Sequence, residues 1–178
     1  AVYRRDFEEL IWVDGDVNFE IEDIKKLQNS GKDVIAGVYP FKGHPEMTFD
    51  PISDDQQILF GEKGGIYEVN CVATGFLYTK REVYEDMVEG LNLTLCNTSF
   101  DCPSYPWFRP NVWEEGNEKY YLGEDFSFCK YAKQVGYKIF IDSTIKLEHI
   151  GKYAYTWEDL IYKKSKVKNL TYCKSSMQ

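Results

Sequence analysis

The arrangement that most constrains the fold is a strand, a helix and a second strand within the first 40 residues. Residues 10–13 form a short apolar run that ends abruptly at Asp14-Gly15-Asp16, as a buried strand does. Residues 20–29 carry apolar side chains three positions apart, which is typical of one face of a helix. Residues 34–39 are a second apolar run, stopped by Pro40. This order predicts a β-α-β unit, and hence a parallel strand pair in an α/β sheet.

The rest of the chain alternates regular segments with two irregular regions. Further strands are expected at residues 58–60, 69–78 and 137–141, and further helices at 80–89 and 123–136. Residues 41–65 and 92–119 otherwise lack periodicity, and loops of this length in a compact domain are usually functional or mobile. No internal repeat or second domain boundary is visible. We therefore expect one domain covering residues 1–178.

Composition and charge narrow the classes of function. A hydrophobic content of 43% and an aromatic content of 16% indicate a packed core rather than disorder. The formal net charge of -8 disfavours a surface for nucleic acid or anionic membrane. No apolar run approaches the roughly 18 residues that span a bilayer, and no signal peptide is visible. The five cysteines are odd in number and lack metal-ligand spacing. The alternatives are a bridge between Cys96 and Cys102 or free buried thiols in a reducing compartment; the second is favoured, and a cytoplasmic location is expected.

An acidic pair lies where the first expected strand ends. In open α/β sheets, ligands bind beyond the carboxyl ends of the strands, and Asp14 and Asp16 lie there. Gly15 allows the backbone to turn tightly between them. Two hard oxygen ligands at this spacing suit Mg²⁺ or Mn²⁺ that also holds a diphosphate. The alternative is a pair of turn aspartates that cap the next helix.

Three later side chains have a similar choice of roles. Glu124 and Asp125 begin an expected helix, so each can be a cap near the positive end of the helix dipole. Alternatively, one of these carboxylates accepts a proton from an acceptor hydroxyl. His149 follows an extended segment, where a neutral imidazole can be a third metal ligand or a structural residue.

In this order, these residues resemble the glycosyltransferases of the GT-A fold type, from about Glu8 to about Tyr155. The segments that carry the resemblance are residues 10–17 with the D-x-D motif, 35–40, 73–76 around Gly75, 123–128 with an E-D motif, and 149–151 with the late histidine. Within that class the sequence is similar to the sugar-transferring enzymes of chloroviruses, large DNA viruses of algae that glycosylate their own capsid protein.

The resemblance implies a fold and a metal site. The fold would be α/β of the GT-A type (Rossmann-like), with a mainly parallel sheet flanked by helices. Asp16 would bind Mn²⁺ or Mg²⁺ directly, and Asp14 would contact the donor ribose or share the cation. His149 would be the second protein ligand, with donor phosphates and water completing the coordination. Gly75 would lie near the donor phosphates and the acceptor.

The resemblance also implies a reaction. A hexosyl or deoxyhexosyl group would move from a nucleotide-sugar donor, with a UDP-sugar favoured, to a hydroxyl of a glycan acceptor. Asp125 would be the general base of an inverting displacement, with Glu124 orienting it or holding acceptor hydroxyls. Trp107 and Trp113 are candidates for an acceptor platform or for core packing. For a viral enzyme, the compartment would be the host cytoplasm.

One departure from the family pattern concerns the nucleotide. The family places a β-α-β portion before the D-x-D strand, yet only 13 residues precede Asp14. Either that portion is absent from this chain or this family is reduced, so base specificity is not readable from the sequence. Two other classes compete. A nucleotidyltransferase would carry a Gly-rich, basic phosphate loop near its N-terminus, which is not seen. A non-catalytic sugar- or metal-binding module has no chemical need for all three motifs.

Overall fold

A computed structural model describes residues 7–44, 46–160 and 168–174, so the domain predicted for residues 1–178 includes residues outside this described part. The helices are α1 (Ile21–Gln28), α2 (Arg81–Gly90) and α3 (Glu124–Gln134), with a 3-10 turn at Trp157–Leu160. The strands are β1 (Glu9–Val13), β2 (Val17–Asn18), β3 (Val34–Ala36), β4 (Phe49–Asp50), β5 (Ile58–Gly61), β6 (Ile66–Val69), β7 (Cys71–Val72), β8 (Phe76–Lys80), β9 (Asn111–Glu115), β10 (Glu118–Leu122), β11 (Ile139–Asp142), β12 (Glu148–Ile150), β13 (Ala154–Tyr155) and β14 (Asn169–Tyr172).

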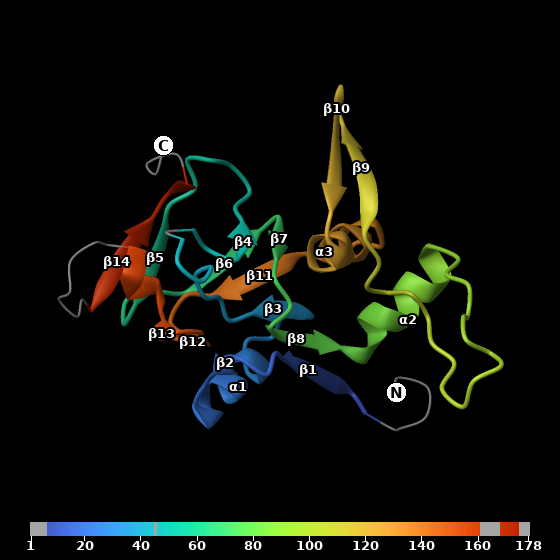
Figure 1. Cartoon of the computed structure of the whole chain (residues 1–178), viewed down its shortest axis with the longest axis horizontal. Coiled ribbons are helices and arrows are strands. Elements are labelled where there is room, and N and C mark those ends of the chain that lie inside the picture. The colour runs from blue at the N-terminus through green and yellow to red at the C-terminus, as the bar shows by residue number, and fades with distance from the viewer. Residues whose placement is uncertain (1–6, 45, 161–167, 175–178) are drawn as a thin grey trace.

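The central sheet has the strand order β1-β8-β3-β11-β6 (Figure 1). Of the nine strand pairs in the described residues, only that between β3 and β11 is parallel. The remaining strands form small antiparallel sheets of two or three strands, and the three α-helices have 8, 10 and 11 residues. The prediction of a mainly parallel, helix-flanked, Rossmann-like sheet is therefore wrong.

The reason for this error is the position of β8. Strands β1 and β3 do run in the same direction, as the predicted β-α-β unit requires, but both pair with β8 between them and run antiparallel to it. Periodicity reveals that a segment is a strand, but it does not reveal which strand lies beside it. As a result, the carboxyl ends of β1 and β3 flank the amino end of β8 at one edge of the sheet.

Strand β8 is buried on both faces. Phe76 and Tyr78 belong to a core cluster that also contains Leu27 of α1, whereas Leu77 belongs to the larger cluster that contains Phe128 of α3. Because successive strand residues point to opposite faces, this division gives β8 an apolar layer on each side. No helix among the described residues is long and apolar enough to cross a membrane.

Thr79 supplies a buried polar contact of β8 that can be tested. Its hydroxyl lies 2.8 Å from the hydroxyl of Tyr84, which also accepts a hydrogen bond of 2.7 Å from Trp12 Nε1. We expect Thr79→Val to lower the free energy of unfolding by about 1–2 kcal/mol, because the shape is retained and two hydrogen bonds of the hydroxyl are lost, that to Tyr84 and one of 3.4 Å to the carbonyl oxygen of Leu10. Urea denaturation measures this change, with the exposed Thr94→Val as the control. Equal midpoints for both variants would contradict the expectation.

Candidate functional site

The candidate site lies at the sheet edge where β1 ends and β8 begins. Val13 is paired with Phe76 in the sheet. Asp14, which follows Val13, is therefore a neighbour of Gly75, which precedes Phe76. The backbone N–H of Asp14 donates to the carbonyl oxygen of Gly75 at 2.9 Å. The acidic turn and the glycine, which are about sixty positions apart in the sequence, are thus in direct contact.

Tyr39, which follows β3, fills the space beside Gly75. A Cβ atom on Gly75 would lie 2.0 Å from the Tyr39 hydroxyl oxygen and 2.7 Å from Asp14 Oδ2, so only glycine fits. Burial raises the pKa of the Tyr39 hydroxyl well above its usual value, and the negative charges of Asp14, Asp125 and Asp16 raise it further. The hydroxyl therefore stays protonated among three carboxylates, where it can donate a hydrogen bond.

Strand pairing brings His149 to Asp16. His149 is paired with Val17 in the β12–β2 ladder, and Ile150 donates its backbone N–H to Asp16 O at 2.7 Å. The Nδ1 atom of His149 lies 3.0 Å from the carbonyl oxygen of Pro40. Because a carbonyl only accepts, Nδ1 carries the proton of this hydrogen bond. The other ring nitrogen, Nε2, faces Asp16 Oδ2 at 3.8 Å.

Tyr39 also contacts the histidine. The centroids of the Tyr39 and His149 rings are 4.7 Å apart, with an angle of 60° between the ring planes. The side chain of His149 is only 16% exposed, so this packing and the bond to Pro40 together restrict its orientation. Tyr39 thus connects the imidazole to the Asp14–Gly75 contact.

Asp125, in the first turn of α3, is held by a residue from the β7–β8 connection. The hydroxyl of Thr74 donates to Asp125 Oδ1 at 2.6 Å. Burial raises the pKa of the Asp125 carboxyl, and the charges of Glu124 and Asp14 add to this, although hydrogen bonds from Thr74 act in the opposite direction. A carboxylate with a raised pKa is better suited to accept a proton than an ordinary aspartate.

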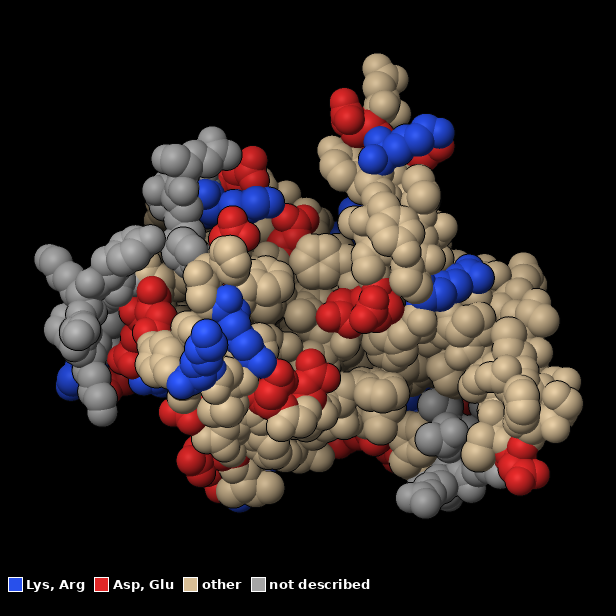
Figure 2. Space-filling model, in the orientation of Figure 1, with Lys and Arg blue, Asp and Glu red and all other residues tan. Residues whose placement is uncertain are grey.

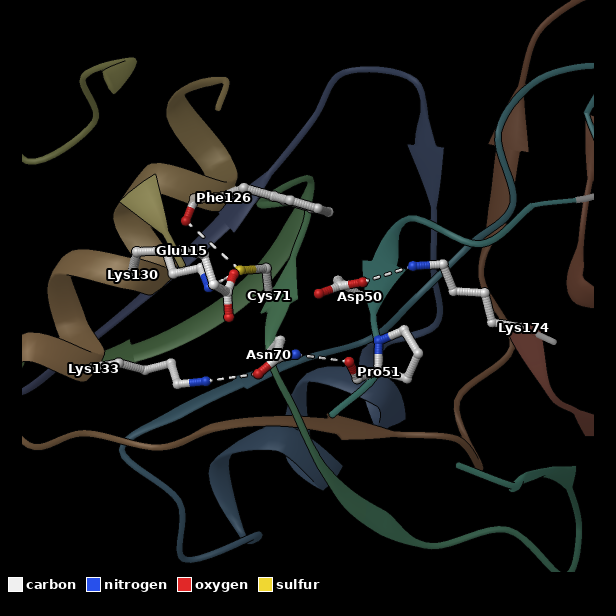
Figure 3. A network of polar contacts seen from close by, with 9 residues as sticks. All are labelled: Asp50, Pro51, Asn70, Cys71, Glu115, Phe126, Lys130, Lys133 and Lys174. Atoms are coloured by element: carbon white, nitrogen blue, oxygen red, sulfur yellow. Dashed lines mark hydrogen bonds and ion pairs between the residues drawn. The ribbon is translucent and has the colours of Figure 1, made fainter. Parts of the chain in front are cut away.

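Some of the polar contacts in Figure 3 link α3 to β7 and to the segments beside the β4–β7 pair. Lys133 Nζ donates to Asn70 Oδ1 at 2.9 Å, and Asn70 Nδ2 donates to the carbonyl of Pro51 at 2.8 Å. The thiol of Cys71 lies 3.8 Å from the carbonyl oxygen of Phe126. Lys133 thus links the C-terminal end of α3 to the segment before β7, and Cys71 of β7, the strand that leads towards Thr74 and Gly75, contacts the first turn of α3.

The sequence predicts one site for Asp14, Asp16, Gly75, Asp125 and His149, and the structure brings all of them to this edge. Glu124 is the exposed first residue of α3. Figure 2 shows two groups of acidic side chains near the middle of the face in view, with basic side chains beside one of them. The predicted roles of these residues in catalysis and metal binding stay predictions.

Sequence reasoning missed Tyr39, Lys42 and Thr74 as site residues. Lys42 Nζ lies 2.5 Å from Asp16 Oδ2, and this hydrogen bond is the largest of the effects that lower the pKa of the Asp16 carboxyl. Tyr39 and Lys42 follow β3 as the aspartates follow β1, so the rule that ligands bind beyond the carboxyl ends of strands could have found them. The irregular composition of residues 41–65 concealed that signal.

The side chains at the candidate site match the ligands of a divalent cation only in part. In the described residues, no group of three or more His, Cys, Asp or Glu side chains is arranged to hold a metal, so Asp14 does not join Asp16 and His149 as a third ligand. The 3.8 Å between Asp16 Oδ2 and His149 Nε2 is longer than the separation of about 3.0 Å expected for cis ligands of an octahedral cation and shorter than that of about 4.2 Å expected for trans ligands. The half-exposed Asp16 side chain would therefore have to turn slightly for both atoms to bind one ion. The bond from Nδ1 to Pro40 is the outer contact that ligating histidines usually make. Asp16 and His149 could therefore supply two ligands to a cation, and the phosphates of a nucleotide-sugar donor and water would fill its other coordination positions.

The two tryptophans considered for an acceptor platform pack against other aromatic residues. Trp107 Nε1 donates to the carbonyl of Tyr84 at 3.1 Å, and the two rings meet edge to face. The Trp113 ring lies 5.4 Å from that of Tyr131. The exposed aromatic side chain nearest in sequence to Asp125 is Tyr121 of β10, which is 76% exposed. The β9–β10 hairpin that carries it stands away from the other strands (Figure 1).

Comparisons with known proteins give a structural likeness alone. No protein-family model matches this chain, and no curated protein matches it. The crystal structure of A197 from STIV is similar, with a TM-score of 0.50 and 20% sequence identity. The match covers 88% of this chain and 66% of A197, so this chain spans just under two thirds of the length of that protein. At this level of identity, the likeness concerns the fold and carries no statement about activity.

Proposed function

We propose that this protein is a metal-dependent glycosyltransferase that moves a sugar from a nucleoside-diphosphate sugar to a carbohydrate hydroxyl. The observation that carries the proposal is the convergence of Asp16, His149 and Asp125, from three distant segments, around the Tyr39–Gly75 contact. Convergence of possible metal ligands and a carboxylate of raised pKa at one sheet edge is typical of a catalytic site.

On the donor side, Asp16 and His149 would hold Mn²⁺ or Mg²⁺ together with the donor diphosphate. A divalent cation bound there supplies charge neutralisation for the diphosphate leaving group. The Asp14 carboxylate, which lies against Gly75, would contact the donor ribose, and the missing side chain of Gly75 allows Tyr39 and Asp14 to lie close together at this sheet edge. A UDP-sugar is the favoured donor by resemblance, and the proposed compartment is the cytoplasm, or the host cytoplasm for a viral protein.

On the acceptor side, Asp125 would accept the proton of the attacking hydroxyl. The bond from the acceptor oxygen to the anomeric carbon forms as the bond from that carbon to the phosphate oxygen breaks, and the electron pair leaves with the diphosphate. A single displacement of this kind inverts the anomeric configuration. The hydrogen bond from Thr74 would aim the carboxylate, and Glu124 would hold further acceptor hydroxyls.

A thermal-shift experiment with UDP and Mn²⁺ tests the donor site. Ligand that binds only the folded state at a hundred times its dissociation constant stabilises it by about 2.7 kcal/mol. We expect UDP with Mn²⁺ to raise the melting temperature, and Asp16→Ala to lose the Mn²⁺-dependent part of the rise. Asp101→Ala, which removes an exposed carboxylate elsewhere, should keep it. An equal rise in Asp16→Ala, or no rise with any nucleoside diphosphate in the unaltered protein, would remove the proposed donor site.

A further inference from the structure

The loop that follows β3 carries a lysine into the candidate site. Pro40 and Met47 form an isolated β-bridge, and Phe41 N–H donates to Glu46 O at 2.9 Å, so the loop is closed at its base. Lys42 extends from this loop, and its Nζ atom lies 2.5 Å from Asp16 Oδ2. The lysine therefore contacts the carboxylate proposed to bind the cation.

The path of the lysine side chain depends on Gly151. A Cβ on Gly151 would lie 3.1 Å from Lys42 Cδ and 3.3 Å from Tyr155 Cε2, so the aliphatic stem runs close over the β12–β13 turn. His149, from β12 at the start of the same turn, faces the same carboxylate oxygen of Asp16 at 3.8 Å. The ammonium and the imidazole thus converge on one atom.

That oxygen cannot serve the ammonium and a divalent cation together. A metal ligand lies about 2.1 Å from its ion, and a lysine ammonium in hydrogen-bond contact with the same oxygen would be repelled by the like charge at short range. The Lys42 side chain is 36% exposed and that of Asp16 is 46% exposed. The ammonium can therefore leave Asp16 without passing through the core, and the four-carbon stem of lysine is flexible enough to redirect it.

A diphosphate at this edge would need positive charge close by. The protein has a formal net charge of -8, and Asp14, Asp16 and Asp125 all raise the pKa of the same tyrosine, Tyr39. An anionic ligand would be repelled by this group of carboxylates unless cations bind with it. Once displaced from Asp16, the Lys42 ammonium lies within reach of any phosphate bound to a cation at Asp16.

We propose that Lys42 exchanges between two partners: Asp16 when no divalent cation is bound, and the donor diphosphate when the cation occupies Asp16. This inference rests on the proposed function and adds a residue that couples the two ligands. The lysine competes with the cation for Asp16 and, once displaced, binds the diphosphate. Metal and nucleoside diphosphate therefore favour each other's binding, and the coupling is equal in both directions.

Titration calorimetry with the variant Lys42→Met tests the exchange, because methionine keeps an apolar stem and removes the charge. We expect the affinity for Mn²⁺ alone to rise about two- to fivefold, since an exposed competing ion pair is lost. The affinity for UDP at saturating Mn²⁺ should fall about ten- to hundredfold, since a charge-assisted hydrogen bond is lost. Lys42→Arg should keep most of the UDP affinity. Lys25→Met, an exposed lysine of α1, makes the same change in net charge and should alter neither affinity.

The outcomes separate this inference from the proposed function. A weaker affinity of Lys42→Met for Mn²⁺ would mean that the lysine only holds Asp16 in place, and it would overturn the exchange. Unchanged UDP affinity in that variant would overturn it as well, while leaving the donor site intact. If the unaltered protein bound neither Mn²⁺ nor UDP, both the proposed function and the exchange would fall together.

Discussion

Replacing Asp125 with Asn is expected to lower the rate of sugar transfer about 10²- to 10⁴-fold, while UDP and Mn²⁺ still bind. Asn keeps the shape of the side chain, and its carbonyl oxygen can still accept the hydrogen bond from the Thr74 hydroxyl. It cannot accept a proton from the acceptor. A single-turnover assay with donor and acceptor measures the loss, and calorimetry of UDP with Mn²⁺ serves as the control. Loss of UDP binding would reassign Asp125 to the donor site.

The pH dependence provides a second check on the same residue. A general base works in its deprotonated form, so the rate falls as the pH drops through its pKa. Because burial raises the pKa of Asp125 above the usual 3.8, the acid limb of the rate profile should lie above that value. Thr74→Val removes a hydrogen bond that favours the charged carboxylate, so it should move this limb to higher pH. A limb that stays in place would show that another group titrates.

Gly75→Ala is expected to disrupt both the fold and the donor site. Its Cβ would lie 2.0 Å from the Tyr39 hydroxyl oxygen, which is far inside contact distance, and Tyr39 is only 4% exposed. Overpacking of this kind costs typically about 1–3 kcal/mol of unfolding free energy. Because Asp14 lies against the same space, we also expect the Mn²⁺-dependent stabilisation by UDP to be lost. Urea denaturation and thermal shift with UDP and Mn²⁺ measure the two effects.

Two further variants identify the clash as the cause. Tyr39→Phe removes the hydroxyl, so the double variant Gly75→Ala/Tyr39→Phe should recover part of the lost stability, a coupling between neighbours that separate sites do not have. Gly65→Ala is the matched control, because a Cβ at Gly65 meets no atom within 4 Å. A double variant no more stable than Gly75→Ala alone would locate the strain elsewhere than at the tyrosine hydroxyl.

Local patterns in the sequence predicted the elements better than their arrangement. The apolar spacing over residues 20–29 and the glycine at position 123 correspond to α1 and to the start of α3, which the structure confirms. The predicted pairing of the first two strands was wrong, because β8, from the middle of the chain, inserts between β1 and β3. Residues 92–119 were expected to be irregular, yet they contain β9, whose exposed residues give little apolar alternation to detect.

The candidate site was partly predictable for a related reason. Acidic motifs that end a strand or begin a helix can be found locally, which is why Asp14, Asp16 and Asp125 were identified. Tyr39 looks like an ordinary apolar strand residue, and its importance depends on the missing side chain of Gly75 across the sheet edge. Lys42 lies in a loop with no periodicity, so its contact with Asp16 is visible only in three dimensions.

The sequence separation of the contacts that assemble the candidate site has a consequence for folding kinetics. The hydrogen bond between His149 and Pro40 spans 109 positions, and that between Thr74 and Asp125 spans 51. Contacts of such high sequence separation form slowly, because the chain must close large loops before they contribute any stability. We therefore expect Asp16, His149 and Asp125 to come together only late in folding. Under the proposed function, acquisition of Mn²⁺ binding would report a fully folded molecule, and partly folded chains would not consume the sugar donor.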